Sequence, residues 1–69
     1  MPTIDRGVTV KVRTADNKVL ARRAVSGVEE GDSFPIVWVC REEEWEAARR
    51  EGREPQAVPW PADAVETAA

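Results

Sequence analysis

Apolar and polar residues alternate strictly in a segment near the start of the chain. In VTVKVRT, which begins at residue 8, valine occupies every second position and threonine, lysine or arginine the positions between. This period of two is typical of a half-buried strand. A second segment of strand-like composition, VLARRAV, begins at residue 19 after Asp16 and Asn17, two residues that suit a tight turn. We predict an antiparallel hairpin over residues 8–25 with one apolar and one basic face.

The register of this hairpin follows from the requirement that its apolar positions share a face. With Asp16 and Asn17 as the two turn residues, Val12 lies opposite Ala21. A slip by one residue would mix the faces, which is costly wherever one face is buried. The same register sets Lys11 opposite Arg22 on the outer face, where like charges repel. We therefore expect an acidic group of this chain, of a second chain or of a ligand to neutralise that pair.

The middle of the chain predicts a third strand followed by a helix. FPIVWVC, residues 34–40, is apolar on both faces, so we expect other parts of the protein to cover both. Pro35 cannot donate a backbone hydrogen bond and is therefore expected at the start of the strand or on an edge. REEEWEAARREG follows, with glutamates in its first turn and arginines in its last, which favour the helix dipole. Gly52 is a natural stop, and Trp45 anchors the small apolar side of the helix.

These elements predict one small α+β domain. Its sheet has three mainly antiparallel strands with one helix packed on it: the hairpin 8–25, the strand 34–40 and the helix at about 42–51. A small SH3-like barrel is the alternative architecture. The chain has 69 residues. Domains near this size bury only about 60% of their unfolded surface, so self-association is a real possibility.

The last part of the chain, REPQAVPWPADAV, is punctuated by prolines. It predicts extended chain through Trp60 and a short final turn over residues 61–65. Trp60, held between two prolines, is either a lid on the core or an exposed anchor for a partner. Residues 1–6 and 66–69 are expected to fray, as chain ends usually do.

Composition argues against catalysis and against metal or cofactor binding. The chain has no histidine and a single cysteine, so it offers no disulfide, no zinc set and no Ser–His or Cys–His pair. Cys40 lies in an apolar strand, where core packing is the expected role. The acidic loop around Glu29 does not match the ligand spacing of a calcium loop. No segment resembles a membrane span or signal peptide, so we expect a cytoplasmic protein that is not an enzyme.

Charge is unevenly distributed along the chain. The net charge is −3, yet the first 25 residues are net basic and the remainder net acidic. Lys11, Arg13 and Arg22 are expected on one side of the hairpin, with Lys18 near its turn, and such a stripe could contact phosphates. Against nucleic acid stand the acidic total and the lack of an aromatic residue in the hairpin to stack on bases.

We therefore predict a non-enzymatic binding or regulatory module that acts through protein–protein contacts, with a protein partner or as a homodimer. A nucleic-acid-binding module that uses the basic hairpin face is the alternative. No cofactor, metal or small-molecule ligand is indicated. The candidate binding surface consists of Lys11, Arg13, Lys18, Arg22 and Trp60.

The resemblance of this chain to known proteins lies mainly in the segments VWVCREEEWEAARREGREP and VPWPADAV. In these segments and in its length it resembles small proteins of high-GC actinobacteria and of their mobile elements or phages. The resemblance implies a cytoplasmic accessory protein. It includes no motif with assigned chemistry, so it transfers no functional residue to this chain.

Overall fold

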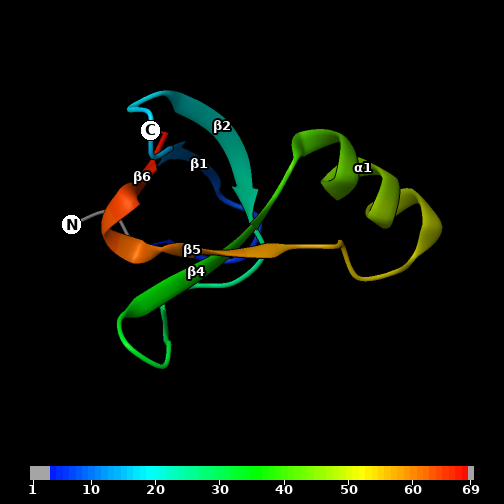
Figure 1. Ribbon diagram of the computed structural model, residues 1–69. Helices are drawn as coiled ribbons and strands as arrows, with labels where there is room; N and C mark the ends of the chain where they lie inside the picture. The colour runs from blue at the N-terminus through cyan, green and yellow to red at the C-terminus, as the bar shows by residue number, and fades with distance from the viewer. Residues whose placement is uncertain (1–3, 69) are drawn as a thin grey trace.

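The computed structural model describes residues 4–68 and shows an α+β protein with one helix and an antiparallel, strongly curled sheet (Figure 1). The predicted α+β class is therefore confirmed. The strands are β1 (Thr9–Arg13), β2 (Val19–Ala24), β3 (Glu29–Glu30), β4 (Pro35–Cys40), β5 (Val58–Pro61) and β6 (Val65–Thr67). The helices are α1 (Glu42–Glu51) and the short 3-10 helix η1 (Ala62–Ala64).

β4 is the central strand of the sheet, as its two apolar faces require. Its second half pairs with β2 and its first half with β3, and β5 runs along its opposite edge. β2 pairs in turn with β1, and β1 with β6. The prediction of three strands was too low. The additional strands escaped it because β3 and β6 are only two and three residues long and β5 contains two prolines.

The path of the chain from β5 to β6 curls the sheet into a half-barrel. β5 pairs with β4 near one end of the sheet, η1 turns the chain, and β6 pairs with β1 near the other end. Residues 66 and 67, which we expected to fray, lie in β6, and the backbone N–H of Ala68 donates to the carbonyl of Thr9 at 3.1 Å. The fraying expected for residues 1–3 and 69 falls outside the described residues.

The hairpin formed by β1 and β2 exists, but its predicted register is wrong by one residue. Val12 lies opposite Leu20, and Val10 lies opposite Arg22. The cause is the turn, in which Asn17 adopts a left-handed conformation with a φ of 67°. Its conformation suits a three-residue loop between the hydrogen-bonded ends of the strands, where the sequence argument assumed a two-residue turn.

The shifted register moves the basic side chains. Lys11 lies opposite Ala21, so the predicted Lys11–Arg22 pair does not form. Since directly opposed residues share a face of the sheet, Arg22 belongs to the face that carries Val10, and Lys11 belongs to the other. The predicted basic stripe is therefore split between the two faces.

The core lies inside the curl of the sheet and consists largely of valines. Val10, Val12 and Val37 are completely buried, and Val39 is 1% exposed. Ala24 and Val65 complete this cluster, and Trp60 packs against it from the rim. Valine suits these positions because branched side chains pack well on a pleated surface.

The helix α1 contacts the sheet near the end of β2 through Trp45. The guanidinium groups of Arg6 and Arg23 lie 5.5 and 5.7 Å from the centre of the Trp45 ring, within the range of cation–π contacts. Arg23 also pairs with Glu42 at the start of the helix. The predicted bounds of the helix are confirmed, and Gly52 ends it at a φ of 67°.

Candidate functional site

The five predicted binding residues do not form one surface. Lys11 and Arg13 are exposed on the outer face of β1, and Lys18 is exposed beyond the turn. Arg22 is half-buried on the opposite face of the sheet. The hairpin therefore does not present the continuous basic face that the sequence predicted.

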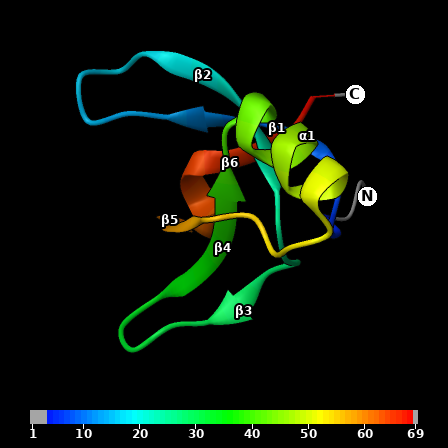
Figure 2. The same cartoon turned by 90° about the vertical axis from the view of Figure 1, so that its right-hand side faces the viewer.

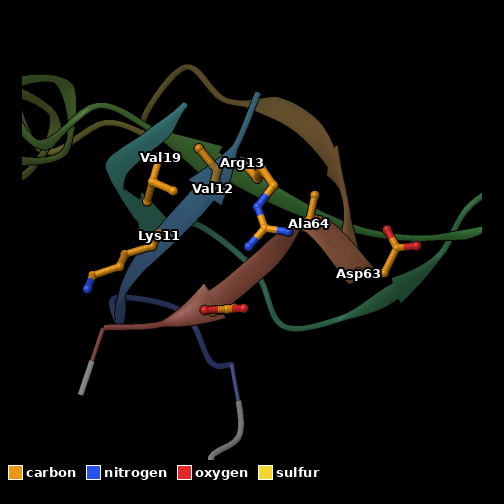
Figure 3. Close-up of a pocket in the computed structure, with 7 residues that line it drawn as sticks. Lys11, Val12, Arg13, Val19, Asp63 and Ala64 are labelled. Atoms are coloured by element: carbon orange, nitrogen blue, oxygen red, sulfur yellow. The ribbon is translucent and has the colours of Figure 1, made fainter. Parts of the chain in front are cut away.

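Acidic residues of β6 and η1 lie beside the basic residues of β1. Lys11 is directly opposite Glu66 in the pairing of β1 with β6. Arg13 lines a small hollow together with Asp63 and Glu66. Figure 3 shows the side chains of Lys11 and Arg13 extending in different directions from β1. These acidic residues belong to the C-terminal segment of the chain.

Three further arginines form ion pairs that connect separate parts of the fold. Arg6 pairs with Glu54 at 3.1 Å, and Arg23 pairs with Glu42, which lowers the pKa of the Glu42 carboxyl. Arg53 pairs with Glu44 at the foot of the helix. The Arg23 pair ties the helix to β2, the Arg53 pair ties the helix to the segment after it, and the Arg6 pair ties that segment to the chain before β1. These three cations are therefore already engaged.

Trp60 is both a lid on the core and an accessible side chain. Its indole packs against the buried valine cluster and is half-buried. Its Nε1 donates a hydrogen bond to the backbone carbonyl of Arg13 at 3.1 Å, which fixes the ring between β5 and the end of β1. Indoles combine a large apolar surface with a hydrogen-bond donor, and this combination is enriched at interface hot spots.

An apolar surface surrounds Trp60 between two turns. In Figure 2 the turn between β1 and β2 and the turn between β3 and β4 project to the same side, and the end of β5 lies between them. One open hollow lies toward the first turn and another toward the second, and both include Pro59, Trp60 and Pro61. We define the Trp60 surface as Ala15, Phe34, Pro59, Trp60, Pro61 and Ala64.

The sequence identified only Trp60 among these residues. Phe34 was assigned to the third strand, but it precedes β4 and its side chain is 53% exposed. Pro59 and Pro61 were visible as neighbours of Trp60, and their outward position follows from alternation along β5. Ala15 and Ala64 carry no signal of their own, because only the curl of the sheet brings their turns together.

The described residues offer few groups for chemistry. Cys40 is buried, and burial raises the pKa of its thiol, which disfavours the reactive thiolate. Within residues 4–68 there is no group of three or more histidine, cysteine or carboxylate side chains that could hold a metal ion. The same part of the chain has no helix long and apolar enough to cross a membrane.

Comparison with known proteins adds no relative: no protein-family model, no curated protein and no solved structure matches this chain significantly.

Proposed function

We propose that this protein is a non-enzymatic binding module that holds a segment of a partner protein on the Trp60 surface. The observation that carries the proposal is the fixed position of Trp60, whose ring is held by the Arg13 carbonyl and bordered by open hollows toward two turns. A side chain that is already ordered loses little conformational entropy when a partner binds. The compact scaffold and the short turns suit such a role.

The chemistry of the Trp60 surface supports a protein ligand. Phe34 at 53% exposure and the rings of Pro59 and Pro61 offer apolar contact area around the indole. Interfaces of proteins are enriched in aromatic anchors of this kind and depleted of charge at their centre. Asp32 and Arg13 lie at opposite ends of this surface and would form a polar rim.

Nucleic-acid binding has less support as an alternative. Lys11 and Arg13 remain exposed, but Glu66 and Asp63 lie beside them. Arg22 lies on the other face of the sheet and cannot contribute to the same contact with a phosphate backbone. A duplex ligand would meet neighbouring charges of both signs on this face, which weakens the electrostatic attraction on which non-specific binding depends.

A peptide selection tests the proposal even though the partner is unidentified. Random peptides displayed on phage are selected on the immobilised protein, and the enriched peptides are measured by fluorescence anisotropy. We expect Phe34→Ala to weaken their binding by about tenfold, as truncation of an aromatic anchor does. Phe34 is chosen because it lies outside the buried core, so its removal leaves the fold intact.

Val28→Ser is the matched control, because Val28 is 56% exposed and lies outside the Trp60 surface. It should leave the affinity unchanged. Failure to enrich any peptide, or equal affinity of the enriched peptides for Phe34→Ala and the native protein, would contradict the proposal. Analytical ultracentrifugation of the protein alone adds a further outcome. If the protein forms a dimer and Phe34→Ala dissociates it, the partner is a second copy of the chain.

A further inference from the structure

A further hollow, which shares Trp60 but no other residue with the Trp60 surface, opens on the inner side of the curl between β2 and β5. Its apolar lining includes Val39, Val58 and Trp60, and Val58 is 54% exposed. It exists because β2 diverges from β4: the two strands pair only at Arg23 and Ala24, and Figure 1 shows them separating beyond that point. The half-barrel is thus open on this side.

On its edge beside this hollow, β2 has backbone N–H and C=O groups that pair with no neighbouring strand within residues 4–68. Hydrogen bonds from Thr14 to Lys18 and from Ala24 to Val8 show that the even-numbered residues of β2 face β1. The backbone groups of Val19 and Ala21 therefore point away from β1, toward the side that β4 has left. β5, on the far side of the hollow, lacks two N–H donors at its prolines and is a poor template for another strand.

The charges in the hollow favour an acidic occupant. Arg22 and Arg41 line it, and neither makes an ion pair within residues 4–68. Glu44, the acidic residue of its lining, is already paired with Arg53. A second copy of β2 is disfavoured as the occupant, because Lys18, Arg22 and Arg23 would bring like charges together.

Arg22 also covers part of the free edge. Its Nη1 donates to the carbonyl of Ala21 at 2.7 Å, so the guanidinium occupies one acceptor that an added strand would use. A carboxylate forms a stronger, charge-assisted hydrogen bond with a guanidinium than a neutral carbonyl does. An acidic side chain could therefore draw Arg22 away and leave the Ala21 carbonyl free for the strand that carries it.

We propose that the hollow between β2 and β5 is a second binding site, which takes an extended acidic segment of a partner protein as an additional strand on β2. The backbone of the segment pairs with Val19 and Ala21. Its carboxylate contacts Arg22, and an apolar side chain two positions away lies against Val58. Strand addition to an exposed sheet edge is an established way to bind a peptide. This site shares Trp60 with the Trp60 surface, but Arg22, Val58 and the edge of β2 do not belong to that surface.

Synthetic peptides with a defined charge test this site. The probes are fluorescein-labelled peptides of alternating valine and threonine with one glutamate, which differ in the position of that glutamate, and counterparts with glutamine. We expect the best glutamate peptide to bind about tenfold or more tightly than its glutamine counterpart, since a hydrogen bond to a charged group is at stake. Arg22→Gln should remove this preference, and Arg22→Lys should retain part of it.

Arg49→Gln is the matched control, because it removes the same charge from an exposed residue of α1 that does not line the hollow. It should leave the preference for glutamate unchanged. Amide hydrogen exchange supplies the second measurement: the bound peptide should slow exchange at Val19 and Ala21 and leave Leu20, which already faces β1, unaffected.

Three results would overturn the proposal: no binding by any glutamate peptide, equal binding of glutamate and glutamine peptides, or no added protection at Val19 and Ala21. A dimer of the free protein that Arg22→Gln abolishes would assign the hollow to a second copy instead. None of these results bears on the proposal for the Trp60 surface. That proposal is tested by Phe34→Ala, and Phe34 does not line this hollow.

Discussion

The indole Nε1 of Trp60 and the backbone carbonyl of Arg13 are joined by a 3.1 Å hydrogen bond between residues 47 positions apart in the chain. The bond ties β5 to the end of β1, two strands that do not pair with each other. It therefore closes one end of the half-barrel through a side chain, and it does so with the residue on which the proposed binding surface is centred.

Trp60→Phe tests the structural part of this role. The substitution keeps an aromatic ring but removes the donor, and leaves the Arg13 carbonyl without this partner. We expect the free energy of unfolding to fall by about 1 kcal/mol, as for a typical hydrogen bond. Urea unfolding followed by circular dichroism measures it. Trp38→Phe is the control, because the Trp38 indole makes no hydrogen bond within residues 4–68, and it should cost less.

The hairpin shows how far alternation alone predicts a structure. The period of two located β1 correctly, because half-burial imposes alternation on a strand, and composition after the turn located β2. The pairing between them depended on the turn, and the left-handed backbone of Asn17 was not visible in the letters Asp-Asn. The apolar pattern favoured the wrong register, because the observed one sets Arg22 opposite Val10 and Ala21 opposite Lys11 and so mixes apolar and basic residues on each face.

Substitutions at Asn17 test this turn. Its φ of 67° lies in the region that glycine and asparagine tolerate and β-branched residues avoid. Asn17→Val should lower the free energy of unfolding by about 1–2 kcal/mol. Asn17→Gly should preserve it or raise it slightly. Thermal unfolding compares the variants, and equal stability of the valine and glycine variants would contradict the assigned turn.

The charge asymmetry of the chain has a partial explanation in the sheet. The sequence predicted an acidic group to neutralise an opposed Lys11–Arg22 pair, which does not form, and it did not predict β6, whose three residues carry no strand signal by themselves. Glu66 lies opposite Lys11 only because η1 turns the chain back along β1. A contact of this kind, between distant segments, depends on the path of the chain and not on a local pattern.

A charge reversal at Lys11 tests the pairing of β1 with β6. Lys11→Glu sets two carboxylates opposite each other and should destabilise the protein by a few tenths of a kcal/mol, about the size of a cross-strand pair. The double variant Lys11→Glu with Glu66→Lys restores opposite charges and should recover most of the loss. A double-mutant cycle at low salt measures the coupling, and additive effects would show that the two residues do not interact.

The docking of α1 depends on arginines that the sequence could not assign. Trp45 was expected to anchor the helix on apolar surface, whereas it lies against the guanidinium groups of Arg6 and Arg23. The expected anchor was right and its partners were missed, since a charged residue in a strand gives no sign of what it will contact. Arg23 is held in place by Glu42 and by the carbonyl of Gly7.

Arg23→Gln tests this arrangement. The substitution removes the ion pair with Glu42 and one of the two cations beside Trp45, so the helix should detach from the sheet more readily. We expect faster amide hydrogen exchange throughout α1, with little change in β1. Arg50→Gln, a change at an exposed arginine in the last turn of the same helix, should leave exchange in α1 nearly unchanged.

The contact between Glu44 and Arg53 makes stability depend on acidity. The side chain of Arg53 at 2.5 Å and the backbone N–H of Gln56 at 2.9 Å hold the pKa of Glu44 below the usual glutamate value of 4.5. Because the pKa is lower in the folded protein, the unfolded chain takes up the proton first as the pH falls. The stabilisation is therefore complete above pH 4.5 and is lost as the pH falls through the folded-state value.

Glu44→Gln removes this titration and should flatten the loss of stability below pH 4.5, while it lowers stability at neutral pH. The urea midpoint measured at a series of pH values gives the comparison. Glu43→Gln is the matched control, since Glu43 lies in the same helical turn and makes no ion pair within residues 4–68. If the two variants show the same dependence on pH, the Glu44–Arg53 contact does not contribute to acid stability.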